Sequence, residues 1–126
     1  MTGKLKNHKP SLKEVLQSIS DDPNWENPNK EVYIDSLDLV GDSPLHTMVY
    51  RNDIYAVNLL IESKANLNAQ GEINDTPLHI AVSQAHVEII KSLLNAGAKS
   101  DIKSDCGKTA YEMAKEIGGE VLNAFK

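Results

Sequence analysis

The sequence predicts an all-α repeat solenoid, a short stack of helix–turn–helix units closed by helical end caps. Three observations predict it. A nine-residue pattern recurs at intervals of 33 residues, as "GDSPLHTMV" (41–49), "NDTPLHIAV" (74–82) and "GKTAYEMAK" (107–115). The third residue of each copy is of a type that caps helices, and apolar residues recur at helical spacing after the first two copies. A repeat of this period is typical of stacked units that share one continuous core.

The first helix of each unit has a recognisable start. Ser43, Thr76 and Thr109 are N-cap residue types, whose side-chain oxygens accept a backbone N–H of the first helical turn. Pro44 and Pro77 follow the first two caps, at the first helical position, where a missing N–H costs nothing. We therefore predict a helix directly after each cap residue.

The histidines of the repeated pattern are interpreted as structural. Thr109 and Glu112 form a capping box in the third copy. His46 and His79 occupy the position that Glu112 fills there. A neutral imidazole at this position can hydrogen-bond to the cap hydroxyl or to the backbone, so these histidines are expected to stabilise helix starts.

The second helix of each unit carries apolar residues at helical spacing. In the first two copies these are Ile54, Val57, Leu60 and Ile61, and then Val87, Ile90, Leu93 and Leu94. Gly97 then ends the helix in a left-handed conformation. The first copy has Lys64 at the equivalent position, a departure expected to cost about 1 kcal/mol if the backbone is the same.

Both ends of the stack are expected to be capped. "PSLKEVLQSIS" (10–20) has a Ser11–Glu14 capping box and an apolar stripe of Leu12, Val15, Leu16 and Ile19. At the other end, "GGEVLNAFK" (118–126) allows a short helix with Val121, Leu122 and Phe125 inward. The segment between the cap and the array (21–41) begins as a loop, which holds the single tryptophan, Trp25, and its second half fits a first finger. Trp25 either packs the amino-terminal cap or forms a lip of an interface.

A 33-residue unit with "TPLH", then "HVEIIKSLLNAGA", then a polar loop resembles the ankyrin repeat. The resemblance covers about 34–126. It is strongest in the second copy and weakest in the third, which lacks Pro-Leu-His. The resemblance implies helix–turn–helix units with β-hairpin fingers that stack side by side and bind other proteins.

The resulting organisation is one domain preceded by a tail. Residues 1–9 are expected to be a flexible basic tail, and 10–126 a single ankyrin-repeat domain. Within it, the segments are the N-terminal cap helix and first finger (10–39), repeat 1 (40–72), repeat 2 (73–105) and a degenerate C-terminal capping repeat (106–126).

No pattern of catalytic or metal-binding residues stands out. His46, His79, His86 and Cys106 lack the spacings of a compact zinc site. Ser83, Thr47 and Cys106 lack the context of a known nucleophile, and there is no Gly-rich phosphate loop. We therefore expect no enzyme activity, no cofactor and no metal.

The charge distribution points to a basic protein partner. Four of the 13 basic residues lie in 1–13, so the rest of the chain has 9 basic against 18 acidic side chains. Such an acidic body repels nucleic acid and favours a basic surface. No apolar run is long enough to span a membrane, and a single cysteine, Cys106, favours a reducing cytoplasm. The expected protein is a cytoplasmic monomer.

The repeat register also predicts which positions face a partner, because they serve no core function. In the resembled fold, fingers and first helices line a concave surface. The positions are Leu39, Val40, Asp42, Tyr50, Arg51, Gln70, Glu72, Ile73, Asp75, Ser83, Gln84, Lys103, Asp105, Cys106, Lys108 and Glu116. Tyr50 and Arg51 are of the types favoured at binding hot spots.

One column at the fingertips is apolar. Val40, Ile73 and Cys106 are 33 residues apart. They form either an exposed strip inside an acidic rim, as an interface with a basic partner would need, or a set of side chains tucked under neighbouring fingers.

The expected function is protein binding without catalysis. Small free-standing ankyrin proteins resemble immunity proteins encoded beside bacterial secreted toxins. An acidic concave face suits a basic toxin domain, so neutralisation of such a domain is the most specific hypothesis. The alternative is a passive scaffold or regulatory ankyrin adaptor in a larger complex.

Overall fold

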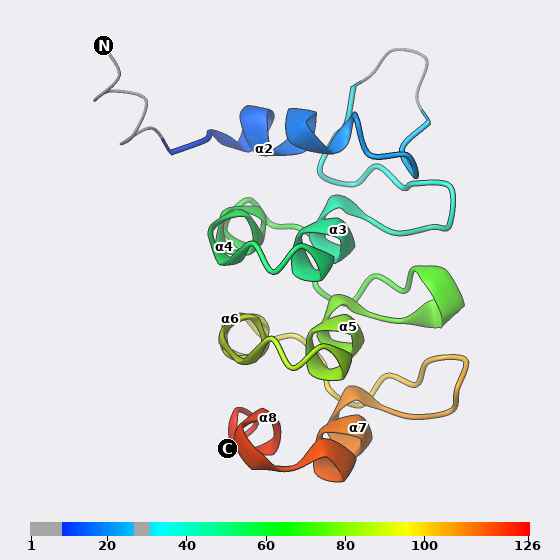
Figure 1. Ribbon diagram of the computed structural model, residues 1–126, viewed down its shortest axis with the longest axis vertical. Coiled ribbons are helices and arrows are strands. Elements are labelled where there is room, and N and C mark those ends of the chain that lie inside the picture. The colour runs from blue at the N-terminus through cyan, green and yellow to red at the C-terminus, as the bar shows by residue number, and fades with distance from the viewer. Residues whose placement is uncertain (1–8, 27–30) are drawn as a thin grey trace.

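The structure is a computed structural model that describes residues 9–26 and 31–126, and Figure 1 shows these residues folded as a stack of helical pairs. In chain order, the elements are α2 (Leu12–Ile19), α3 (Pro44–Tyr50), α4 (Ile54–Glu62), the 3₁₀ helix η1 (Glu72–Asn74), α5 (Pro77–Ser83), α6 (Val87–Asn95), α7 (Ala110–Ile117) and α8 (Gly119–Asn123). The predicted all-α solenoid is confirmed. Residues 1–8 of the predicted basic tail lie outside the described residues.

The helices form an inner and an outer column. The inner column holds α3, α5 and α7, and the outer column holds α4, α6 and α8 (Figure 1). Along the inner column α5 contacts both α3 and α7, and along the outer column α6 contacts both α4 and α8. At one end α2 packs on α3 and α4, with Val15, Leu16 and Ile19 buried. The amino-terminal cap is therefore confirmed, and α8 closes the other end through the buried Val121.

Helical spacing predicts most of the core of the outer column. Leu60, Ile90 and Leu93 are completely buried, as expected. Ile54, the first residue of α4, is instead 38% exposed. Ile89, which the predicted stripe omits, is completely buried. The apolar face is therefore wider than the predicted stripe.

The three inner helices begin where the caps predict. The side-chain oxygens of Ser43, Thr76 and Thr109 each accept the backbone N–H of the residue three positions on. The residue at that third position returns a bond to the N–H of the cap residue, so a reciprocal capping box is present in every unit.

The histidines at this position, His46 and His79, do more than cap. His79 Nδ1 accepts the backbone N–H of Thr76 at 3.1 Å, and its Nε2 lies 3.0 Å from the carbonyl oxygen of Lys108 in the next unit. His46 does the same one unit earlier, with its Nε2 2.9 Å from the carbonyl oxygen of Asp75. Because a carbonyl only accepts, Nε2 carries the proton and Nδ1 is the acceptor. Each buried imidazole therefore joins its helix to the following unit.

The third unit uses a carboxylate in the same place. Glu112 Oε1 accepts the N–H of Thr109 at 3.1 Å, and this hydrogen bond lowers the pKa of Glu112 below its usual value. Glu112 is exposed, unlike the buried His46 and His79. It caps its own helix and forms no hydrogen bond to another unit within the described chain.

The fingers are tight turns rather than β-hairpins. We define them as finger 1 (38–42), finger 2 (71–75) and finger 3 (104–108). Each is closed by a hydrogen bond from the N–H of its first residue to the carbonyl of its fifth, at 2.8, 2.9 and 3.1 Å. Within the described residues no strand forms, and a single bridge joins Lys103 and Thr109. The predicted β-hairpins are therefore wrong in this detail, because the closing bonds lie so near the turn that no ladder follows.

The loop after α2 packs against the first repeat. Trp25 is 6% exposed, and its indole Nε1 donates to Thr47 Oγ1 at 3.3 Å. The N–H of Leu39 bonds to the carbonyl of Asn24 at 3.0 Å, which ties this loop to finger 1. Of the two interpretations of Trp25, packing of the amino-terminal cap is confirmed.

Lys64 adopts the left-handed conformation that its position predicts, with φ +70°. Its equivalent in the second unit, Gly97, has φ +100° and no Cβ to strain. We expect Lys64→Gly to raise the free energy of unfolding by about 1 kcal/mol, because an L-residue pays about that much for this backbone region. Urea denaturation checks the change. Gly97→Lys is the matched control and should lower stability by a similar amount; equal stabilities across the set would contradict the backbone argument.

Candidate protein-binding surface

The fingers and the inner helices together form one candidate binding surface. The three fingers project to the same side of the inner column (Figure 1). Of the sixteen predicted positions, fourteen are exposed, Asp75 is partly buried and Asp42 is buried. The exposed set is Leu39, Val40, Tyr50, Arg51, Gln70, Glu72, Ile73, Ser83, Gln84, Lys103, Asp105, Cys106, Lys108 and Glu116. The repeat register therefore predicts surface positions well, with one clear departure.

Asp42 is that departure, because it joins two fingers instead of facing outward. It is 5% exposed, and its Oδ1 accepts the N–H of Glu72 at 2.9 Å. Gly71 makes room for this contact, since a Cβ built there would overlap the Asp42 carboxylate. The pair Asp42 and Gly71 thus fixes finger 1 on finger 2.

Two hydrogen bonds join fingers 2 and 3, and a third joins the residues directly before them. The N–H of Asp105 donates to the carbonyl of Ile73 at 2.8 Å, and Asn74 Nδ2 donates to Asp105 Oδ1 at 2.7 Å. Gln70 Nε2 adds a bond to the carbonyl of Lys103 at 3.2 Å. The three fingers are therefore one connected surface rather than independent loops.

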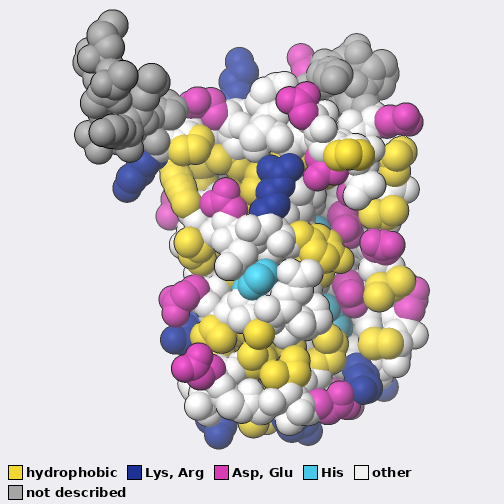
Figure 2. Space-filling view, viewed as in Figure 1, with side chains coloured by type: hydrophobic (Ala, Val, Ile, Leu, Met, Phe, Trp, Pro, Cys, Tyr) yellow, Lys and Arg dark blue, Asp and Glu magenta, His cyan; other side chains and the backbone are white. Residues whose placement is uncertain are grey.

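The fingertip column is an exposed strip. Val40 is 40% exposed and Ile73 56% exposed, and Cys106 is exposed as well. The interpretation that these side chains tuck under neighbouring fingers is therefore wrong. Figure 2 shows hydrophobic and acidic side chains alternating down the finger side, with basic ones near its lower end.

A cavity of about 350 Å³ opens where finger 1 meets the inner helix α3. Its lining consists of Asp22, Asn24, Asp38, Asp42, Thr47, Tyr50, Arg51 and Glu72. Four carboxylates therefore share the cavity with one guanidinium. Asp22, Asn24 and Asp38 were missed from the sequence. Asp22 and Asn24 lie outside the repeat, and only the register shared by 38, 71 and 104 could have marked Asp38 as a finger residue.

Tyr50 and Arg51 both interact with carboxylates of this cavity. Burial raises the pKa of Tyr50 above its usual value, and the nearby carboxylates, led by Asp42 and Glu72, raise it further. Arg51 Nη2 lies 3.5 Å from Asp22 Oδ2, at the outer limit of a hydrogen bond. The two predicted hot-spot residues, Tyr50 and Arg51, therefore both line the acidic cavity.

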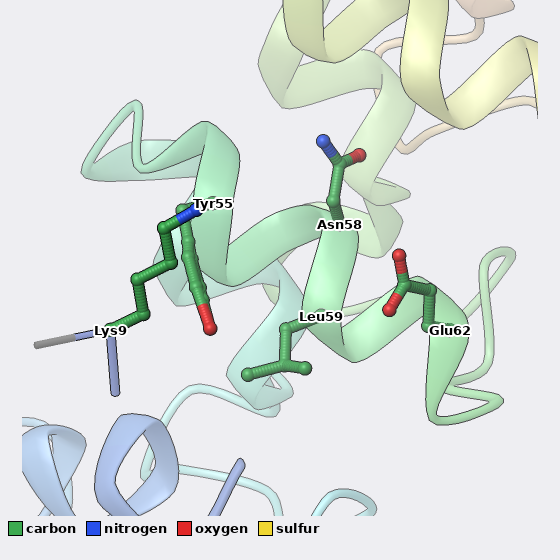
Figure 3. Close-up of a pocket in the computed structure, with 5 residues that line it drawn as sticks. All are labelled: Lys9, Tyr55, Asn58, Leu59 and Glu62. Atoms are coloured by element: carbon green, nitrogen blue, oxygen red, sulfur yellow. The ribbon is translucent and has the colours of Figure 1, made fainter. Parts of the chain in front are cut away.

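A second, shallower cavity lies on the outer column. It has about 300 Å³ and is lined by Lys9, Tyr55, Asn58, Leu59 and Glu62. Figure 3 shows the Lys9 side chain running alongside Tyr55, with Glu62 at the far end of α4. Tyr55 Oη donates to the carbonyl of Pro10 at 2.8 Å. This hollow therefore lies where α4 contacts the segment before α2.

The residues considered for metal binding or catalysis do not gather at one site in the described structure. Within residues 9–26 and 31–126, no group of three or more His, Cys, Asp or Glu side chains is arranged to hold a metal ion. Cys106 is exposed, and a hydrogen bond with the Ser104 hydroxyl lowers its thiol pKa. His86 Nε2 contacts Gln84 Oε1 at 3.0 Å. None of the described helices has the length and apolar character to cross a membrane.

Comparison with known proteins agrees with the repeat pattern. A family model described as ankyrin repeats, in three copies, matches residues 5–114. The chain is 32% identical over 88 residues to the palmitoyltransferase AKR1 of Candida albicans. The matched segment covers 70% of the chain and 11% of that protein. The chain is 40% identical over 76 residues to the BRCA1-associated RING domain protein 1 of Caenorhabditis elegans, covering 60% of the chain and 11% of that protein.

A smaller relative is matched over more of its length. The chain is 28% identical over 97 residues to protein phosphatase 1 regulatory subunit 27 of Mus musculus, covering 77% of the chain and 63% of that protein. The chain thus spans about a tenth of the two larger relatives and less than two thirds of this one.

Proposed function

The chain belongs to the ankyrin-repeat family, which makes it a protein–protein interaction module, and we propose that its partner docks on the fingers and inner helices through a basic surface. Ankyrin repeats account for the matched part of the chain, while the chemistry of the described surface supports the choice of face. The partner would contact the exposed fingertip column and the acidic cavity beside Tyr50.

The charge of this face is the observation that carries the proposal. Asp38, Asp42, Glu72, Asp75 and Asp105 all lie on the fingers. On the same surface, Lys108 is paired with Glu116 at 2.7 Å, and Arg51 lies beside Asp22. An apolar strip bordered by carboxylates favours a basic partner, because complementary charge speeds encounter and disfavours other partners.

Ile73 supports the same face through its backbone. It has φ +49°, in the left-handed region, where a β-branched residue is strained by roughly 1–3 kcal/mol. Its side chain is 56% exposed, so burial does not offset that cost. Burial of this apolar side chain by a partner would offset the backbone strain.

Neutralisation of a basic toxin domain is the more specific form of the proposal. A module that covers a basic surface blocks whatever that surface binds, and a basic surface is typical of sites that take nucleic acid. On this hypothesis the protein acts in one-to-one complexes, as an immunity protein does. The gene of such a protein should lie directly downstream of the gene for its toxin.

The second candidate is a regulatory adaptor. It is favoured by the mouse relative, which is named a regulatory subunit of protein phosphatase 1 and is matched over 63% of its length. An adaptor would use the same face to hold a partner without blocking it. Adding the chain to its purified partner separates the two hypotheses, since only the neutralising form abolishes the partner's activity.

Ile73→Asn tests the proposed docking face, because it should raise stability and lower affinity for the partner. We expect stability to rise by about 1 kcal/mol, because asparagine tolerates the left-handed region better than isoleucine. We also expect affinity for a partner captured by the immobilised full chain to fall by about tenfold or more, as for an apolar anchor in an interface. Urea denaturation measures the first effect and calorimetric titration the second.

The matched control is Ile54→Asn, which makes the same exchange at an exposed position of the outer helix α4. Its affinity should equal that of the unmodified chain. Loss of affinity in Ile54→Asn but not in Ile73→Asn would move the interface to the other side of the stack.

A further inference from the structure

The cavity beside Tyr50 contains negative charge that the fold does not use. Glu72 contributes only its backbone N–H to the contact between fingers 1 and 2. Its side chain is exposed and makes no ion pair or hydrogen bond with any described residue. The neighbouring carboxylates are held in place, so the cavity is preorganised around one free acidic group.

Backbone N–H groups hold these neighbouring carboxylates. Asp38 Oδ1 accepts the N–H of Val40 at 3.0 Å and that of Asp42 at 2.8 Å. Asp42 is buried and bonded to the N–H of Glu72. Neither carboxylate can turn away from the cavity without losing the hydrogen bonds that hold fingers 1 and 2 in place. Their charges therefore stay directed at whatever enters.

The cavity also has an aromatic wall. Tyr50 lines it and is 43% exposed, and its hydroxyl forms no hydrogen bond with another described residue. The pKa of this hydroxyl is raised by burial and by the carboxylates around it, so Tyr50 remains a neutral phenol. An exposed tyrosine next to fixed carboxylates favours a cation with a flat surface.

We propose that this cavity receives an arginine side chain of the partner protein. This proposal rests on the proposed function. The guanidinium of the arginine lies between the free carboxylate of Glu72 and the Tyr50 ring, with Asp38 behind it. The volume of about 350 Å³ accommodates one long side chain. The aliphatic residues Leu39 and Val40, next to the cavity in finger 1, contact the apolar neighbours of that arginine.

Arginine fits this cavity better than lysine for two reasons. Its planar guanidinium stacks on aromatic side chains and forms paired hydrogen bonds to carboxylates. It is also more weakly hydrated than an ammonium group, so less solvation is lost on entry. Arg51 lies 3.5 Å from Asp22 and makes no ion pair with Glu72, so the Glu72 carboxylate stays available for a second guanidinium.

A small probe tests the cavity without the partner. We expect Nα-acetyl-arginine amide to produce saturable NMR shifts at the amides of Tyr50 and fingers 1 and 2 of the full chain, in the millimolar range. Nα-acetyl-citrulline amide, which has the same shape without the charge, should produce none. Glu72→Gln should weaken arginine binding by about tenfold, as expected for the loss of one charge-assisted hydrogen bond.

Glu62→Gln is the matched control, since it removes the same charge from the outer helix α4, and it should leave the titration unchanged. Equal shifts with the citrulline and arginine probes, or an unaltered titration in Glu72→Gln, would overturn the proposal. Equal binding of Nα-acetyl-lysine amide would overturn the choice of arginine. The Ile73→Asn measurement reports on the docking face independently, so a misplaced face and a wrong cavity occupant give different results.

Discussion

Replacing His79 by alanine should lower the free energy of unfolding by about 3 kcal/mol, more than the roughly 1 kcal/mol of a lost helix cap. The variant leaves the buried N–H of Thr76 without its acceptor, which costs roughly 1–3 kcal/mol. It also removes the imidazole bond to the carbonyl of Lys108, worth about 1 kcal/mol, although this carbonyl still accepts the N–H of Ser104. Denaturation in urea, with a slope shared by variant and unmodified chain, measures the difference.

Glu112→Ala is the matched comparison, because Glu112 fills the same place in the third unit but is exposed and caps only its own helix. Its loss should stay near 1 kcal/mol. His79→Gln, which keeps an acceptor and a neutral donor, should fall between the two. If His79→Ala and Glu112→Ala cost the same, the bond to Lys108 contributes nothing to stability.

Gly71→Ala should destabilise the chain by about 2 kcal/mol, in the range of overpacking in a well-ordered site. The new Cβ would overlap the carboxylate of Asp42. That side chain is buried and bonded to the N–H of Glu72, so it cannot move aside without losing the contact between fingers 1 and 2. Thermal and urea denaturation both report the loss.

A double-mutant cycle isolates the overlap from other effects of the new methyl group. Asp42→Ala alone should be destabilising, because the N–H of Glu72 loses its acceptor. In that background, Gly71→Ala should cost at least about 1 kcal/mol less than it does alone, since the overlapping oxygen is gone. Additive effects would show that Gly71 is required for its backbone and not for the close approach.

The repeat predicts the fold because its strongest signals are local. The caps at Ser43, Thr76 and Thr109 and the left-handed position of Lys64 depend on residues a few positions away. Such signals can be read from a single sequence. The histidine position was interpreted correctly as a cap, but its bond to the following unit was not predicted. That bond depends on how closely two units stack.

The candidate site was predicted less completely for the same reason. The register places Asp42 among the variable finger positions, yet the neighbouring finger covers it and uses its carboxylate. Asp22 reaches the cavity from a loop outside the repeat, so periodicity carries no information about it. The β-hairpin expectation came from the family resemblance, and these fingers are too short to form ladders. Contacts between units are what the pattern leaves undetermined.

The change from histidine to glutamate along the array has a consequence for repeat engineering. His46 and His79 each need a carbonyl from the unit that follows, whereas Glu112 needs none. In this array, histidine stands where a bond to a following unit forms, and glutamate stands where no such bond forms among the described residues. A designer who lengthens this array should exchange Glu112 for histidine at the junction and move the glutamate to the new last unit.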